Sequence, residues 1–110
     1  KEILQKVDQI NEHQTIYIAN FGHIGDGNIH VNIMYNDDPD QAELAESIVN
    51  KVMREVVAVG GTISGEHGIG NKKSQFMELE ISPKEMAIMK RFKNYFDPKG
   101  IMNPGKMFIR

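Results

Sequence analysis

Two histidines flank a glycine-rich turn in the segment His23-Ile-Gly-Asp-Gly-Asn-Ile-His30. Asp-Gly is a strong signal for a tight β-hairpin, because glycine accepts the positive φ that a two-residue turn requires. With Asp26 and Gly27 as the loop, His23 pairs directly with His30, and their Cβ atoms lie roughly 5 Å apart on one face. Such a pair suits two ligands of one metal ion, or two groups that bind one anion.

The alternation of side chains along the two strands separates an apolar face from a polar one. The apolar face is expected to join the core and carries Ile16, Ile18, Ile24, Ile29, Val31, Ile33 and Tyr35. The opposite face carries Phe21, His23, Asn28, His30 and Asn32. This second face is too polar for an ordinary core, so we take it as the candidate site.

A second glycine-rich segment, Gly60-Gly-Thr-Ile-Ser-Gly-Glu-His-Gly-Ile-Gly70, supplies a carboxylate and a further imidazole. Glycine lets the backbone approach a ligand closely. We expect a short strand over residues 62–64. If this strand neighbours the hairpin, Glu66 can complete a set of two histidines and one carboxylate. That set suits Zn²⁺ or another divalent transition ion. The alternative is that Glu66 and His67 are solvated turn residues.

Composition narrows the function classes. The chain has 110 residues, 40% of them hydrophobic, which is typical of one globular domain. A net charge of −2 without a basic stripe gives no reason to expect nucleic acid, and no apolar run approaches the length of a membrane span. Cysteine is absent, so a metal must use imidazole, carboxylate or substrate oxygen. A phosphate-binding P-loop at residues 65–70 is excluded, because Asn71 stands where lysine must follow.

The helices and strands that must position these residues are predicted from the periodicity of hydrophobic residues and from the residues that typically begin and end helices. We expect a helix over 1–13, the hairpin over 15–35, a helix from Asp37-Asp38-Pro39 to Val59, a short helix over 72–80, and a helix opened by the capping box Ser82-Pro83-Lys84-Glu85. The last helix carries an apolar stripe of Met86, Met89, Phe92 and Phe96. This order indicates an α+β fold, an antiparallel sheet with helices packed on its apolar face and the histidine face left uncovered.

Three motifs in order resemble the C-terminal substrate domain of FAD-linked oxidases: Phe21-Gly-His-Ile-Gly-Asp-Gly-Asn-Ile-His-Val-Asn32, the segment 60–70, and Asp97-Pro-Lys-Gly-Ile-Met-Asn-Pro-Gly-Lys106. The group includes the FAD subunit of glycolate oxidase, D-lactate dehydrogenases and D-2-hydroxyglutarate dehydrogenase. The resemblance implies that residues 1–110 are the C-terminal part of the substrate (cap) domain, and that the FAD-binding domain lies outside this chain. Relatives often have a duplicated ferredoxin-like substrate domain, and this chain looks like its second half.

The resemblance also implies roles for individual residues. His23, His30 and Glu66 match the ligands of a divalent metal, with zinc as the expected ion. Asn32 matches a substrate-contacting asparagine, and His67 matches a general base that also contacts substrate. FAD, bound mainly by the absent domain, would meet two residues near the end of the third motif, Asn103 and Lys106.

The implied reaction oxidises a D-2-hydroxy acid, such as glycolate or D-lactate, to the 2-oxo acid. The metal would bind substrate oxygens and stabilise the developing alkoxide, His67 would take the hydroxyl proton, and hydride would pass from Cα to the flavin. The expected partners are the small hydroxy acid, the FAD-binding domain of the parent chain and, over the uncovered face, a second copy of the chain. We expect a cytoplasmic location, or one at a membrane surface through an electron-transfer partner. The isolated chain is expected to be inactive.

Two other classes stay open at this point. A stand-alone metal-binding module without redox activity would retain metal and have no flavin partner. A metal hydrolase would need a separate carboxylate to activate water, and no obvious one remains once Glu66 is a ligand.

Overall fold

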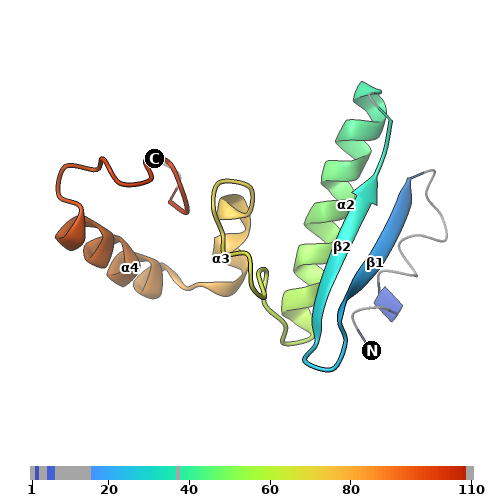
Figure 1. The fold of residues 1–110 in the computed structure, drawn as a ribbon, viewed down its shortest axis with the longest axis horizontal. Coiled ribbons are helices and arrows are strands. Elements are labelled where there is room, and N and C mark those ends of the chain that lie inside the picture. The colour runs from blue at the N-terminus through green and yellow to red at the C-terminus, as the bar shows by residue number, and fades with distance from the viewer. Residues whose placement is uncertain (1, 3–4, 7–15, 37, 109–110) are drawn as a thin grey trace. The chain divides into compact units, whose positions relative to one another are not determined.

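The computed structural model describes residues 2, 5–6, 16–36 and 38–108. Its elements are the strands β1 (Tyr17–His23) and β2 (Asn28–Met34), the helix α2 (Pro39–Ala58), the 3₁₀ turn η1 (Ser74–Phe76), and the helices α3 (Met77–Glu80) and α4 (Pro83–Phe96) (Figure 1). The chain forms two compact units, residues 1–66 and 67–110. The predicted α+β class is confirmed. The helix expected over 1–13 lies largely outside the described residues.

The hairpin pairs β1 with β2 in antiparallel fashion, and its register places His23 opposite Asn28. The predicted two-residue loop is wrong, because residues 24–27 all belong to the turn. Asp26 explains the wider loop, since its Oδ1 accepts a hydrogen bond from the Asn28 backbone N–H at 3.2 Å. The register therefore differs from the prediction by two residues, which leaves every side chain on its predicted face.

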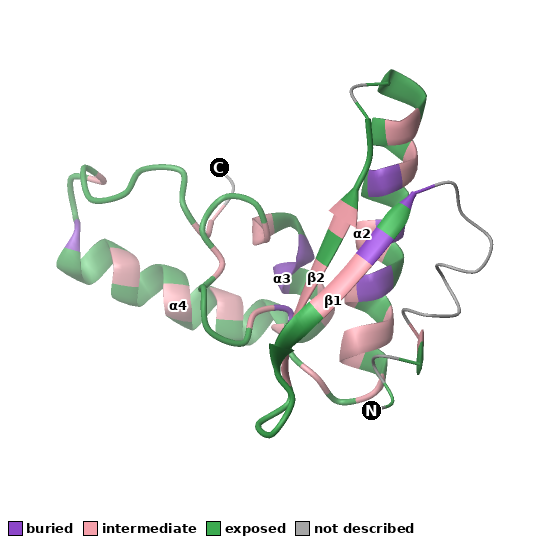
Figure 2. Cartoon of the chain, turned by 45° about the vertical axis from the view of Figure 1, so that its right-hand side comes forward, coloured by how far each residue is buried: buried purple, intermediate pink, exposed green. Residues whose placement is uncertain are grey.

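The core of the first unit lies between the sheet and α2. Its buried residues are Ile16 just before β1, Ile18 on β1, and Ala45, Ile48 and Val52 on α2, with Val31 and Ile33 packed beside them. Figure 2 shows buried positions in purple along β1 and α2. The alternation of the strands thus selects the core correctly. Two expected members are exposed, Ile24 at 70% and Tyr35 at 52%. Ile24 lies in the turn and Tyr35 lies beyond the end of β2.

Local signals set the ends of α2. The carboxylate of Asp38 caps the helix by accepting a hydrogen bond from the Asp40 N–H at 3.0 Å, and Pro39 occupies the first turn. The helix ends at Ala58, followed by Gly60 with a φ of 80°. The strand expected over 62–64 is wrong, because the segment is irregular. The glycines that flank this segment disfavour a regular strand, because glycine loses more conformational freedom on folding than any other residue.

In the second unit, η1 and α3 occupy the region of the helix expected over 72–80, and they bury Phe76 and Met77. The predicted capping box of α4 is confirmed: Ser82 Oγ accepts from the Glu85 N–H at 3.3 Å, and Glu85 Oε2 accepts from the Ser82 N–H at 2.9 Å. The hydrogen bonds from Ser82 hold the pKa of Glu85 below its usual value.

The expected burial of the apolar stripe on α4 is wrong. The helix contains no buried residue, and Phe92 and Phe96 are 62% and 74% exposed. So short a unit has little interior in which to bury a helix face. No helix in the described part of the chain has the length and apolar character needed to cross a membrane.

Gly22 permits the close approach of the two strands, so we expect Gly22→Ala to destabilise the hairpin. Its φ is 147°, and a Cβ there would lie 2.3 Å from the Asn28 carbonyl oxygen. Backbone strain of this kind costs about 1–3 kcal/mol. Gly25→Ala is the matched control, because a Cβ there would have nothing within 4 Å, and its effect should stay within about 0.5 kcal/mol. Urea unfolding of both variants measures the difference; equal stabilities would contradict the register.

Candidate functional site

The polar face of the hairpin carries the predicted site residues. Phe21 lies opposite His30, His23 opposite Asn28, and Ala19 opposite Asn32. The predicted direct pairing of His23 with His30 is therefore wrong, because the loop is longer than two residues. The two histidines are diagonal neighbours on one face, and such neighbours lie roughly 7–8 Å apart rather than side by side.

The side chain of His30 contacts Phe21 and Glu66. Its ring stacks on Phe21 with centroids 5.1 Å apart and planes 22° from parallel, and its Nε2 lies 3.1 Å from Glu66 Oε1. The His30 side chain is 28% exposed and that of Glu66 is 45% exposed. The structure thus joins two of the three predicted metal ligands. It also shows that Phe21 orients the imidazole of His30. The sequence alone does not predict this role, because it depends on the register that places Phe21 opposite His30.

The loop before Glu66 reaches the hairpin without forming a strand. A Cβ on Gly65 would lie 2.6 Å from Oδ1 of Asn28, so the loop backbone approaches that side chain as closely as only glycine permits. This approach brings the next residue, Glu66, to His30. The condition that the glycine-rich segment lies beside the hairpin is therefore met at Gly65 and Glu66, although the expected strand over 62–64 does not form.

The His30–Glu66 pair has the chemistry and spacing of two ligands of one ion. Imidazole nitrogen and carboxylate oxygen bind zinc at about 2.0–2.2 Å, which puts two ligand atoms of a tetrahedral site about 3.3 Å apart. The observed 3.1 Å fits this spacing and also fits a direct ion pair. Within the described residues, no group of three closely spaced potential ligands includes His23.

The other two predicted residues of this site are exposed. Asn32 lies on β2, on the same face as His30. His67 directly follows Glu66 in the chain and is the first residue of the second unit. Their predicted contacts with substrate, and the proton transfer by His67, stay predictions.

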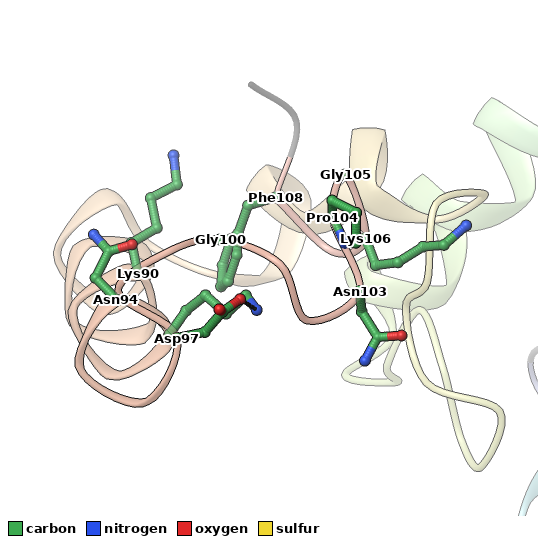
Figure 3. Close-up of a pocket in the computed structure, with 10 residues that line it drawn as sticks. Lys90, Asn94, Asp97, Gly100, Asn103, Pro104, Gly105, Lys106 and Phe108 are labelled. Carbon is green, nitrogen blue, oxygen red and sulfur yellow. Dashed lines mark hydrogen bonds and ion pairs between the residues drawn. The ribbon is translucent and has the colours of Figure 1, made fainter.

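Asn103 and Lys106 line a cavity of about 270 Å³ in the second unit, between α4 and the segment that follows it (Figure 3). The two residues belong to one turn, in which the Lys106 N–H donates to the Asn103 carbonyl at 3.3 Å. Asn103 has a φ of 48°, which asparagine tolerates better than most residues. The Met107 N–H donates to the Gly70 carbonyl, which ties this turn to the glycine-rich segment.

Asp97, just after α4, is the buried acidic residue beside this cavity, and it is 6% exposed. Its carboxylate accepts hydrogen bonds from the Lys93 ammonium and from the backbone N–H groups of Ile101 and Met102, the latter two at 3.0 Å. Lys93 lowers the pKa of Asp97 most; burial opposes the effect and the two amides reinforce it. No role for Asp97 follows from the sequence alone, although its place at a helix end before Pro-Lys-Gly is visible there.

Comparison of the sequence with known proteins shows the family to which it is similar. Residues 1–107 match the family model described as FAD linked oxidases, C-terminal domain. The chain is 46% identical over 110 residues to D-2-hydroxyglutarate dehydrogenase of Stutzerimonas stutzeri, covering 96% of this chain and 24% of that protein. It is 37% identical over 113 residues to glycolate oxidase subunit GlcD of Bacillus subtilis, covering 99% and 24%. A D-lactate dehydrogenase of Anaerostipes hadrus is 36% identical over 109 residues, covering 96% and 23%. The chain thus spans about a quarter of the length of these relatives.

The lowered pKa of Asp97 predicts a stability difference that depends on pH. The unfolded carboxyl titrates near 3.8 and the folded one below that value. The stabilisation by Asp97 is therefore fully present above about pH 3.8 and is lost as pH falls through the folded pKa. We expect Asp97→Asn to reduce the free energy of unfolding at pH 7, and the gap to the wild type to narrow in acid. Denaturant unfolding between pH 7 and pH 2 measures it; a gap that is constant across this range would contradict the assignment.

Proposed function

This chain belongs to the family of FAD linked oxidases, C-terminal domain, and from that premise we propose that it is the C-terminal part of the substrate domain of a flavoenzyme that oxidises a D-2-hydroxy acid to the 2-oxo acid. The observation that carries the proposal is the His30–Glu66 pair, which lies on the polar face of the hairpin. The names of the relatives support the substrate class, since they are enzymes of 2-hydroxyglutarate, glycolate and D-lactate.

The first part of the proposal is that His30 and Glu66 hold a divalent ion, with zinc favoured by a nitrogen and oxygen donor set. When bound, such an ion supplies a Lewis acid that favours the ionised form of a hydroxyl group. Phe21 fixes the plane of the His30 ring by stacking, and Gly65 lets the loop deliver Glu66. A further protein ligand would come from His23, on the same face of the hairpin.

The second part concerns the proton and the substrate. We assign removal of the hydroxyl proton to the imidazole of His67, because histidine is the commonest general base. Asn32 stands on the same face as His30, two residues further along β2. The NH₂ group of its amide donates hydrogen bonds, which a carboxylate or keto oxygen of the substrate accepts.

The third part concerns the flavin, which accepts the hydride when bound. We assign contacts with it to Asn103 and Lys106, which share one turn beside the cavity of the second unit. An amide and an ammonium on such a turn offer hydrogen-bond donors to the heteroatoms of a ring system. The FAD-binding domain of the same parent protein is the partner that this assignment requires.

Metal analysis tests the first part. We expect the full-length protein, purified without chelator, to hold about one divalent ion, and His30→Ala and Glu66→Gln to lose it, since each removes a ligand from a set of three or four. Asn32→Ala is the control on the same face and should retain the ion. His23→Ala should lose the ion as well, whereas His67→Gln should keep it. A metal-free protein with full activity would refute this part.

Turnover tests the reaction and the role of His67. We expect the full-length protein, with FAD and an artificial electron acceptor, to oxidise at least one of glycolate, D-lactate and D-2-hydroxyglutarate. His67→Gln should lower turnover by roughly 10²–10⁴-fold while the metal stays bound, because loss of a general base costs about that much.

Three results would count against these roles. Metal loss in His67→Gln would make His67 a ligand instead of the base. Metal retention without oxidation of any hydroxy acid would favour a metal-binding module. Turnover by the 110-residue chain alone would show that no flavin domain is needed.

A further inference from the structure

The segment between α4 and the turn at residues 103–106 is held by polar contacts. The side chains of Ile101 and Met102 are mostly in water, at 74% and 58% exposure, so apolar packing contributes little to their placement. Their backbone N–H groups both point to the buried carboxylate of Asp97. One carboxylate thus orders the two residues that directly precede Asn103.

Lys93 completes this arrangement from the last turn of α4. Its ammonium donates to Asp97 Oδ2 and also to the backbone carbonyl of Met102. Met102 is therefore held at both its N–H, by Asp97, and its carbonyl, by Lys93. Because that carbonyl belongs to the peptide group that leads into Asn103, fixing it restricts the orientation of the next residue.

We propose that Asp97 and Lys93 are positioning residues, which set the orientation of the turn that carries Asn103 and Lys106. The inference rests on the proposed contacts of that turn with the flavin and deepens them. Lys93 and Asp97 lie at the end of α4, so their positions are set by the helix. Their hydrogen bonds to the backbone of residues 101 and 102 then fix the start of the turn. Charge-assisted hydrogen bonds suit this task because they are shorter and stronger than neutral ones.

A competing interpretation is that the lysines around the cavity form an anion site. The arrangement argues against it. The ammonium of Lys93 is already bound by Asp97 and Met102, and Figure 3 shows the side chains of Lys90 and Lys106 extending in different directions. Lys90 lies instead over the ring of Phe108, 6.0 Å from its centroid. Positioning is therefore the role that the contacts of Lys93 support.

Amide hydrogen exchange in the full-length protein tests the contacts themselves. Lys93→Met keeps the aliphatic stem and removes the charge, so we expect exchange at Ile101 and Met102 to accelerate by roughly tenfold or more. Lys93→Arg keeps the charge and should retain most of the protection. Lys99→Met is the matched control, because Lys99 is exposed in the same segment. Unchanged exchange in Lys93→Met would overturn the proposal.

The flavin provides the second readout. We expect Lys93→Met to shift the visible flavin spectrum and weaken FAD retention in the same direction as Asn103→Ala, and Lys93→Arg to restore both. In the double variant of Lys93→Met and Asn103→Ala, the loss of FAD binding free energy should be smaller than the sum of the two single losses, because both residues act through one turn. In Lys93→Met, the fold-change in KM for the hydroxy acid should be smaller than the fold-change in the fraction of FAD retained.

The outcomes separate the positioning role from the flavin contact on which it rests. If Asn103→Ala shifts the flavin spectrum and Lys93→Met does not, the positioning role is refuted and the flavin contact stands. If Asn103→Ala leaves the spectrum and FAD retention unchanged, the flavin contact is refuted, and the positioning role falls with it. Circular dichroism of each variant confirms that the fold is retained in the comparison.

Discussion

The structure of the first unit depends on the burial of one face of the hairpin against α2. Ile18 of β1 and Ile16 just before it pack on Ala45, Ile48 and Val52 of the helix, and burying a side chain such as isoleucine contributes about 1.5–3 kcal/mol. Because strand side chains alternate, this burial also decides which residues face away from the core. A slip of one residue would bury His30 and expose its apolar neighbours. The core therefore determines where the site lies.

The same constraint explains which parts of the site the sequence predicts. Alternation has a period of two, so a register error of two residues leaves the polar face intact, and His30 and Asn32 lie where expected. Direct opposition of His23 and His30 depends on loop length, which the Asp26 carboxylate widens by bonding the Asn28 N–H. The strand expected over 62–64 did not form for a related reason, because pairing in a sheet depends on contacts between segments that are not local in sequence.

Helix ends were predictable because their signals are local. Asp38 and the pair Ser82–Glu85 make the expected capping hydrogen bonds within a few residues of themselves. The role of Asp97 was not predictable from spacing. It requires the chain to fold back after α4 so that the Ile101 and Met102 amides reach one carboxylate. The exposure of Phe92 was equally hidden, because helical period shows that a stripe exists and not what covers it.

The energetics of the His30–Glu66 contact bear on its purpose. A pair as exposed as this one contributes at most about 1 kcal/mol to stability, since water screens both side chains. Yet the fold meets two demanding conditions to form it. Gly65 lies so close to the Asn28 side chain that a Cβ there would approach within 2.6 Å, and Phe21 is left exposed at 56% in order to stack on His30. The close approach at Gly65 and the exposed ring of Phe21 are poorly explained by so small a gain in stability. A binding site, however, must hold a nitrogen and an oxygen at a fixed separation from one ligand, and these two features do so. The geometry thus supports a binding role for the pair independently of the family to which the chain belongs.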